Sequence, residues 1–341
     1  MGRTRRRLLG SMGLVLVAPT LAWGQSKQAF GQPGGKVARV AFIATTSPLA
    51  EITGPSPANT YVRVFVESLR EHGYVEGRNL VLDMRTLAGN PERLDELVAD
   101  VVRRKADVIY IATSVLVVRA AKLAGTTPIV GLVGSDLIGT SLVKTFARPG
   151  GTVTGPSADV DENLEAKRLE LLVQVAPKVR RIAYIGAREE WARPHTENMR
   201  AAARRLGVTL VHLESEYSDF SEAFARLRGE DVQAVFIERS PRAYGRRQQI
   251  GGLAVASGLP SCCSQSELAD HGCLFTYGAD NLDLARRAAS YVERILRGAK
   301  PGDLPVEAPV KFEMVINMKT ARALGISVPS AILARADRVI E

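Results

Sequence analysis

From Lys36 onward, apolar and polar residues follow two alternating patterns. Short runs of consecutive apolar residues are typical of strands buried on both faces, and apolar residues spaced three or four apart are typical of amphipathic helices. In the first half the predicted strands are 37–44, 80–85, 108–112 and 129–133, and the predicted helices are 59–72, 91–104 and 115–123. Strands that alternate with helices indicate a parallel sheet covered on both faces.

The same alternation resumes in the second half of the chain. The predicted strands are 181–185, 209–213, 234–237, 273–277 and 311–317, and the predicted helices are 194–206, 220–228 and 318–324. A further helix places Ala285, Ala288, Val292 and Ile295 on one stripe. The pattern predicts an α/β protein of two lobes, each a parallel sheet flanked by helices. The last elements are too few for a third domain, so we expect the lobes to share them.

The segment 147–155 lies between the two halves. Pro149 has no backbone N–H, Gly150 and Gly151 tolerate positive φ, and the β-branched Thr152-Val153-Thr154 favours an extended path. By itself such a segment is more often an ordinary loop that enters a strand. Because strand and helix patterns alternate on both sides, we interpret it as a crossing from one lobe to the other.

Residues 1–24 have the features of a secretory signal. Four arginines at positions 3, 5, 6 and 7 precede an apolar run at 8–22, which ends in Ala22-Trp23-Gly24. Residues 4–9 also resemble a twin-arginine export signal. The run is short and interrupted by glycine, so a retained membrane span is disfavoured, and no cysteine follows it that would carry a lipid. We therefore predict a soluble, exported protein without stable membrane insertion.

Composition and charge exclude several other classes. The hydrophobic fraction of 46% and the charged fraction of 24% are those of a globular protein. Removal of the signal lowers the formal charge from +9 to +5. Lysine and arginine are not clustered with aromatic residues, and there is no helix-turn-helix or zinc-finger spacing, so nucleic acid is not an expected partner. About 315 residues remain, enough for two lobes with a core each.

Three cysteines occur, Cys262, Cys263 and Cys273. In an oxidising compartment one disulfide can join Cys273 to either member of the adjacent pair. Alternatively, all three are small buried apolar residues. Their spacing fits neither a Cys-x-x-Cys redox pair nor a tetrahedral metal site, so we expect no metal and no cofactor.

Five short motifs occur in order along the chain: EHGYVEGRN at 71–79, ARPGGTVTG at 147–155, EAKRLELL at 165–172, YG at 277–278 and KFEMVIN at 311–317. Together they resemble the ABC transporter substrate-binding protein family that includes tryptophan- and tyrosine-binding members, built on the type I periplasmic binding fold. The resemblance extends over essentially all of the chain after the signal. It implies a periplasmic receptor that closes over a small ligand and delivers it to a membrane permease with a cytoplasmic ATPase.

In that fold the chain crosses between the lobes three times, here near 153–155, 277–279 and 309–311. The resemblance therefore implies an N-terminal lobe of 36–154 plus 279–310 and a C-terminal lobe of 155–278 plus 311–341. We expect a monomer, since the sequence shows no heptad repeat and no exposed apolar helix.

In open parallel sheets, ligands bind where strands end at their carboxyl side and loops lead into helix N-termini. In the first lobe, the side chains just after the predicted strands are those of Thr46, Ser47, Thr113, Ser114, Ser135 and Asp136. The hydroxyls could hold an α-carboxylate and Asp136 could pair with an α-ammonium group. Each serine or threonine is alternatively a helix cap, but their convergence on one edge favours a binding site.

The second lobe would supply the opposing wall. Its candidate residues are Arg188, Trp191, Glu238, Arg239 and Tyr277. Trp191 could stack on a planar group, and Arg188 or Arg239 could bind an anion through two hydrogen bonds. Alternatively, this loop is a solvated charged segment with one shielding tryptophan, and Tyr277 packs in the hinge.

Family members commonly carry small or amide residues after Ile185, where this chain is charged. The predicted ligand is therefore an amino acid, an aromatic compound or another small acid.

Catalytic function is not expected. The histidines at 72, 195, 212 and 271 accompany no nucleophile elbow and no glycine-rich phosphate loop. A second function that the sequence leaves open is that of an exported ligand sensor that presents its solute to a signalling partner.

Overall fold

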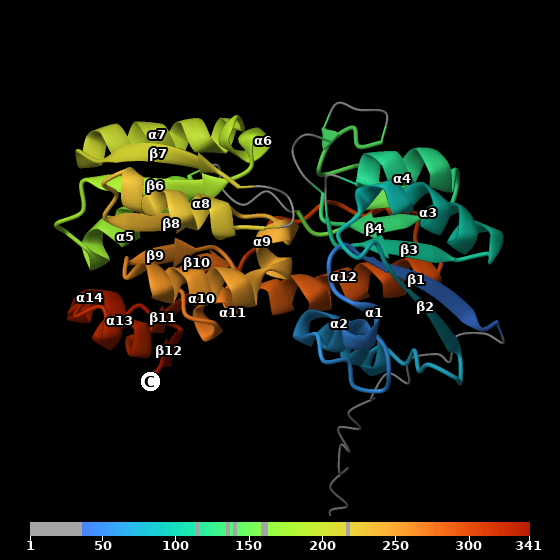
Figure 1. The fold of residues 1–341 in the computed structure, drawn as a ribbon. Helices are drawn as coiled ribbons and strands as arrows, with labels where there is room; N and C mark the ends of the chain where they lie inside the picture. The colour runs from blue at the N-terminus through green and yellow to red at the C-terminus, as the bar shows by residue number, and fades with distance from the viewer. Residues whose placement is uncertain (1–35, 114–115, 134–136, 139–141, 158–162, 216–218) are drawn as a thin grey trace, which may run out of the picture. The chain divides into compact units, whose positions relative to one another are not determined.

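Two sheets organise the chain in the computed structural model (Figure 1). The described residues are 36–113, 116–133, 137–138, 142–157, 163–215 and 219–341. The predicted export signal at 1–24 lies outside them. The first sheet has five strands in the order β2-β1-β3-β4-β5, and all of its described pairs are parallel. Its strands are β1 (Ala38–Ala44), β2 (Leu80–Thr86), β3 (Val108–Ile111), β4 (Ile129–Gly131) and β5 (Val153–Thr154).

Side chains alternate between the two faces of the first sheet, as the strand geometry requires. Val40 and Phe42 pack in one apolar cluster, while Ala41 and Ile43 pack in another. The flanking helices are α1 (Leu49–Ile52), α2 (Thr60–Glu71), η1 (Pro91–Arg93), α3 (Leu94–Arg103) and α4 (Val117–Ala124). A much later helix, α12 (Asn281–Leu296), packs against α2 and contributes Val292 to the first cluster. Segments far apart in sequence therefore share one core.

The second sheet has seven strands in the order β12-β11-β10-β9-β8-β6-β7. They are β6 (Arg181–Gly186), β7 (Thr209–Glu214), β8 (Ala234–Ile237), β9 (Ser261–Cys263), β10 (Phe275–Ala279), β11 (Phe312–Asn317) and β12 (Arg338–Ile340). Its helices are α5 (Leu164–Val175), α6 (Arg188–Trp191), α7 (Pro194–Leu206), α8 (Ser221–Arg226), η3 (Leu227–Gly229), α9 (Pro241–Gly245), α10 (Arg247–Ser257), α11 (Glu267–Asp270), α13 (Met318–Ala323) and α14 (Ser330–Leu333); η4 (Pro301–Asp303) follows α12.

One pair in the second sheet differs from the parallel arrangement that the sequence predicts. β10 and β11 are antiparallel, with Tyr277 opposite Met314 and Gly278 opposite Glu313. The chain leaves the second sheet along β10, forms α12 against the first sheet, and returns along β11. An outgoing and a returning strand that lie side by side must run in opposite directions. A backbone hydrogen bond from Asp280 N–H to the Lys311 carbonyl, 3.0 Å long, joins the two segments beyond the ladder.

Polar side chains fix the helix starts that flank the sheets. The Asn59 side chain accepts a hydrogen bond from the Val62 N–H at 3.1 Å and so begins α2. Asp280 accepts from the N–H groups of Leu282 and Asp283 at 2.8 and 3.0 Å and begins α12. Such caps satisfy backbone donors that have no partner within the helix.

Gly155 follows β5 with φ +142°, which L side chains rarely adopt. A Cβ atom there would lie 2.1 Å from the Gly131 carbonyl oxygen. Only glycine allows the two backbones to approach so closely after the first sheet ends.

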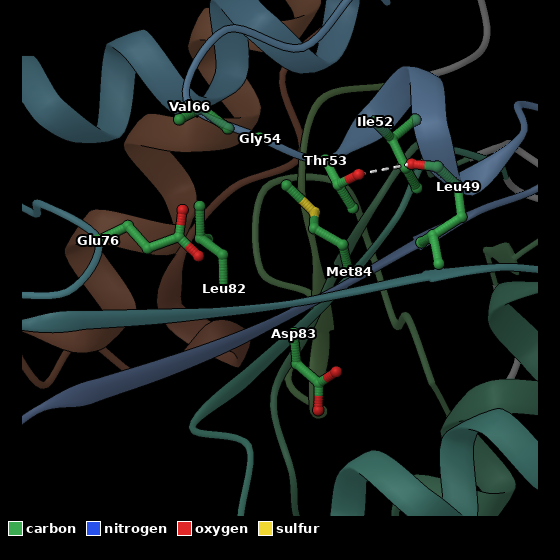
Figure 2. Close-up of a pocket in the computed structure, with 9 residues that line it drawn as sticks. All are labelled: Leu49, Ile52, Thr53, Gly54, Val66, Glu76, Leu82, Asp83 and Met84. Carbon is green, nitrogen blue, oxygen red and sulfur yellow. Dashed lines mark hydrogen bonds between the residues drawn. The ribbon is translucent and has the colours of Figure 1, made fainter.

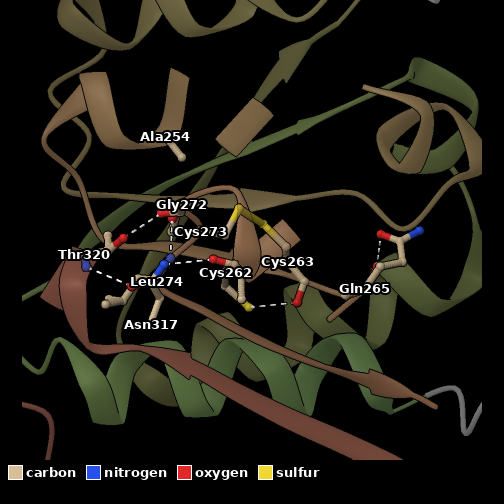
Figure 3. The surroundings of a disulfide bond; sticks show 12 residues. Ala254, Cys262, Cys263, Gln265, Gly272, Cys273, Leu274, Asn317 and Thr320 are labelled. Carbon is tan, nitrogen blue, oxygen red and sulfur yellow. Dashed lines mark hydrogen bonds between the residues drawn. A yellow bond between two sulfur atoms is a disulfide. The ribbon is translucent and has the colours of Figure 1, made fainter. Parts of the chain in front are cut away.

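The three cysteines lie at the end of β9 and in the turn before β10. Cys263 and Cys273 form a disulfide, while Cys262 is a buried free thiol whose pKa burial raises to about 12 (Figure 3). The bond closes the segment that contains α11. The same region is tied to α13, because Thr320 Oγ1 donates to the Gly272 carbonyl at 3.0 Å. Of the two interpretations of the cysteines, the structure therefore has the disulfide.

None of the helices in the described ranges is long and apolar enough to cross a membrane. Within those same ranges, no group of three or more histidine, cysteine or carboxylate side chains is arranged to hold a metal ion.

Candidate functional site

The loop after β1 carries the first predicted site residues. Ser47 Oγ accepts a hydrogen bond from the Asn59 amide at 3.0 Å, and the Ser47 carbonyl accepts one from Thr86 Oγ1 at 2.7 Å. The Asn59 side chain also caps α2, so one amide fixes both the helix start and the serine. Thr46, half-buried, faces Gly245, where a Cβ atom would lie 2.7 Å from the threonine Cβ.

Thr113 follows β3 and is 5% exposed. Its N–H donates to the Ile111 carbonyl at 2.8 Å, which turns the chain directly after the strand. Ser114, Ser135 and Asp136 lie outside the described residues, so their part in a site stays a prediction.

Arg188 and Trp191 belong to the short helix α6. Arg188 is exposed and its Nη2 lies 2.8 Å from Glu214 Oε2. The Trp191 ring stacks on His212 with 4.9 Å between ring centroids, and the Arg200 guanidinium carbon lies 4.8 Å from the same ring. The indole therefore packs against side chains of β7 and α7, which carry His212 and Arg200.

Glu238, the residue after β8, is 1% exposed. Its carboxylate accepts hydrogen bonds from the Ala187 N–H at 2.6 Å, from Ser240 Oγ at 2.7 Å and from Arg242 Nε at 3.0 Å. Arg242 is also buried, and its Nη1 donates to the Ser215 carbonyl at 3.0 Å. Hydrogen bonding and an opposite charge stabilise both ionised groups at a depth where an unpaired charge would be costly.

A cavity of about 420 Å³ lies where the loops after β1 and β2 meet the segment 242–249. Thr46, Ser47 and Glu51 line it from the side of the first sheet. Arg242, Arg246 and Arg247 line it from the side of the second sheet. The cavity thus brings two predicted hydroxyl residues together with three guanidinium groups, and Glu238 lies behind it as the partner of Arg242.

The other described candidates do not line this cavity: Thr113, Arg188, Trp191, Arg239 and Tyr277. Arg239 is half-buried. Tyr277 is half-buried in β10, and its ring stacks on Phe312 of β11 at 6.1 Å, so it packs between the paired strands. This contact favours the hinge-packing alternative for Tyr277, and its part in a site stays a prediction.

A second cavity, of about 280 Å³, lies between α1, α2 and the edge strand β2 (Figure 2). Its lining is mixed: Ile52, Val66, Leu82 and Met84 are apolar, while Glu76 and Asp83 carry carboxylates. Thr53 Oγ1 donates to the Leu49 carbonyl at 2.9 Å beside it. None of the predicted site residues lines it.

Arg168 on α5 is a charged residue that the sequence did not single out for a site. It is 0% exposed, forms an ion pair with Glu165, and places its guanidinium carbon 4.8 Å from the centre of the Phe236 ring. Burial lowers the pKa of Arg168 to about 10, so it remains charged at neutral pH. The signal in the sequence was an arginine with a glutamate three residues before it, both on the buried stripe of a helix.

Arg242 and Arg247 were also missed, since no predicted strand or motif marks them. No periodic signal in the sequence marks Arg242, because Glu238 follows β8 and Arg242 lies in α9, so the loop between the two elements brings their side chains together.

Comparison with known proteins supports the resemblance. Residues 49–340 match the family model described as ABC transporter substrate binding protein. A protein named tyrosine-binding protein from Clostridioides difficile (strain R20291) is 24% identical over 269 residues, which are 78% of this chain and 77% of the relative.

Two solved structures are similar in fold. A conserved domain protein from Vibrio cholerae has a TM-score of 0.77 and 26% identity, with 89% of this chain and 100% of the other covered. An ABC domain from Streptococcus pneumonia, solved in complex with L-Trp, has a TM-score of 0.77 and 22% identity, with 89% and 99% covered. The architecture is that of the type I periplasmic binding proteins, as predicted.

Proposed function

Because the chain belongs to the ABC transporter substrate binding protein family, a family of binding proteins rather than enzymes, we propose that it is the solute-binding component of an ABC importer. It is exported to the periplasm by the signal at 1–24, closes over a small molecule, and delivers that molecule to a permease with its ATPase. The observation that carries the proposal is the cavity lined both by the loop after β1 and by the segment 242–249.

A ligand in such a cavity favours the closed form only as far as it contacts both sides. Thr46 and Ser47 contribute hydroxyl groups from the first sheet, and the arginines contribute donors from the second. Rotation would occur at the three crossings near 153–155, 277–279 and 309–311, with 36–154 plus 279–310 moving against 155–278 plus 311–341. Thr113, Ser114, Ser135, Asp136, Arg239 and the α6 residues remain proposed contacts of the closed form.

The test combines binding and shape. The full chain is expressed in a bacterial host and purified from the periplasmic extract, where an intact mass that lacks the first 24 residues would support the signal. L-tyrosine, L-tryptophan, benzoate, succinate and myo-inositol are then added singly. A solute of this receptor raises the melting temperature by mass action and reduces the radius of gyration in small-angle scattering. If a solute binds without compaction, closure is refuted; if none of a broad solute panel binds, the receptor function is refuted.

A further inference from the structure

The segment 242–247 carries three arginines to one cavity, and their environments differ. Arg242 is paired with the buried Glu238 and donates to Ser215 as well, so its charge is already compensated. Arg246 has no ion-pair partner among the described residues and is exposed. Arg247 is half-buried and has one distant ion-pair contact, with Glu51. The cavity is therefore lined by one arginine whose charge is compensated within the protein, Arg242, and by two arginines with fewer ion-pair contacts, Arg246 and Arg247.

From this arrangement we propose that the cavity binds the carboxylate group of a small organic acid and that Arg247 determines this specificity. The inference rests on the proposed receptor function and names its ligand class.

The position of Arg247 is fixed by the segment that precedes it. Its Nη1 donates to the Tyr244 carbonyl at 3.3 Å, and its guanidinium carbon lies 5.0 Å from the centre of the Tyr244 ring. Only 22% of the side chain is exposed. An arginine held in this way loses little rotational freedom on binding, so more of the interaction energy is available for affinity.

Arg247 also retains hydrogen-bonding capacity. The only carboxylate oxygen within ion-pair distance in the described chain is Glu51 Oε2, at 3.7 Å from Nη2, which is too long for a hydrogen bond. A guanidinium has five N–H donors and its planar edge matches a carboxylate with two parallel bonds. A ligand carboxylate at this edge would form the short contacts that Glu51 does not.

The opposite wall supplies donors as well. Ser47 Oγ accepts its hydrogen bond from Asn59, which leaves the hydroxyl hydrogen able to donate into the cavity. Thr46 adds a second hydroxyl, while Glu51 is the one carboxylate among the lining residues. With Arg242 compensated by Glu238, Arg246 and Arg247 outnumber the one carboxylate, Glu51, and this positive charge suits an anion better than a neutral sugar. The volume of about 420 Å³ fits a small molecule.

The experiment uses pairs of solutes in which one member has a carboxylate and the other has none: L-tyrosine and tyramine, L-tryptophan and tryptamine, benzoate and benzamide, succinate and succinamide. Inorganic phosphate and sulfate are included as anions without a carboxylate. Dissociation constants are measured by calorimetry for the parent protein, for Arg247→Gln, and for Arg204→Gln. Arg204 is an exposed arginine on α7 whose loss removes the same charge elsewhere.

The expected result is that the carboxylate member of at least one pair binds and its partner does not. Arg247→Gln should then weaken that binding about tenfold to a hundredfold, the range for hydrogen bonds to a charged group, and Arg204→Gln should leave it unchanged. Since the paired solutes test the parent protein alone, poor folding of a variant does not leave the idea untested.

Three outcomes would overturn the inference while the receptor function stands: equal binding of a pair's two members, full binding by Arg247→Gln, and binding of myo-inositol or an amine but of no acid. Binding of phosphate or sulfate without any carboxylate would also overturn it, because the site would then recognise a tetrahedral anion. Failure of every solute to bind would count against the receptor itself.

Discussion

Arg242 Nε lies 3.0 Å from a carboxylate oxygen of Glu238, and both side chains are buried, four residues apart in sequence. Glu238 directly follows β8 and Arg242 lies in the first turn of α9, so the pair joins the end of β8 to the wall of the larger cavity. A buried ion pair stabilises a fold little more than well-packed apolar residues of the same size would. Removal of one charge is nevertheless costly, because the opposite charge stays buried without it.

Glu238→Gln should therefore lower the free energy of unfolding by about 3–5 kcal/mol, since it removes the negative charge that faces the buried Arg242 guanidinium. Urea denaturation monitored by fluorescence measures this. The matched control is Glu214→Gln, which breaks the exposed ion pair with Arg188 and should cost far less, because both charges stay solvated. Equal losses in the two variants would contradict the structural role of Glu238.

Replacement of Gly155 tests the close approach after β5. A Cβ atom at this position would lie 2.1 Å from the Gly131 carbonyl oxygen, at a φ of +142°. Gly155→Ala should destabilise the protein by about 2 kcal/mol or more through backbone strain and a backbone clash. Gly252→Ala is the control, because Gly252 lies in α10 and no atom of the described chain lies within 4 Å of the place its Cβ would take. There the better helix propensity of alanine should add about 0.5–1 kcal/mol.

Loss of the disulfide should lower the free energy of unfolding, because the unfolded chain gains conformational entropy when the cross-link is absent. Cys263 and Cys273 are ten residues apart, for which loop-closure entropy predicts about 2.7 kcal/mol at 25 °C. The measurement is urea unfolding of Cys263→Ser/Cys273→Ser against the parent, with and without dithiothreitol. Dithiothreitol should destabilise the parent and Cys262→Ala alike and leave the double variant unaffected. Sensitivity to the reductant that disappears in Cys262→Ala would mean that the bond involves the other member of the adjacent pair.

Glu267 on α11 should make stability fall as the pH rises. Its Oε2 is buried without a hydrogen-bond partner in the described chain, and burial raises its pKa above the usual 4.5. Charged groups near it are Arg247, Glu313 and Arg338. A carboxyl group whose folded-state pKa is raised binds more protons in the folded state, so its protonation stabilises the fold at low pH, and that stabilisation is lost as the pH rises through the folded-state pKa.

The free energies of unfolding of the parent and of Glu267→Gln are compared at two pH values, near 4.5 and about 8. Relative to Glu267→Gln, the parent should be less stable at the higher pH than at the lower one. Glu92→Gln, at an exposed side chain, is measured alongside as the control. A parent that gains stability over Glu267→Gln with rising pH would contradict the direction of the shift.

Strands and long helices could be predicted where apolar periodicity is strong. β8 spans Ala234–Ile237 and α7 spans Pro194–Leu206, as the sequence indicated, because a fully buried apolar run and a proline start are local signals. α10 escaped prediction because it contains Gly251 and Gly252, which weaken the helical pattern. Gly251 is required by packing, since a Cβ atom there would lie 2.2 Å from the His271 carbonyl oxygen. Such a constraint is tertiary and leaves no periodicity in the sequence.

The site was predictable only in part for a similar reason. Residues that follow strands can be read from the pattern, and Thr46 and Ser47 do line the larger cavity. That Glu238 would face inward to Arg242, and that Arg247 would be held by the Tyr244 carbonyl, depends on how α9 and α10 leave β8. The sequence predicts which strand ends carry polar groups but not which of those groups the fold uses to hold one another.

β10 and β11 are hydrogen-bonded to each other from Phe275 opposite Ile316 to Ala279 opposite Phe312, at or beside two of the three proposed crossings. Two separate tethers would permit the halves of the molecule to twist and slide as well as bend. Two hydrogen-bonded strands resist sliding along each other and separating within their plane, because either movement would break the hydrogen bonds between them. The pair bends readily only out of that plane. Motion between the two sheets should then follow essentially one degree of freedom, so that opening and closing retrace a single arc.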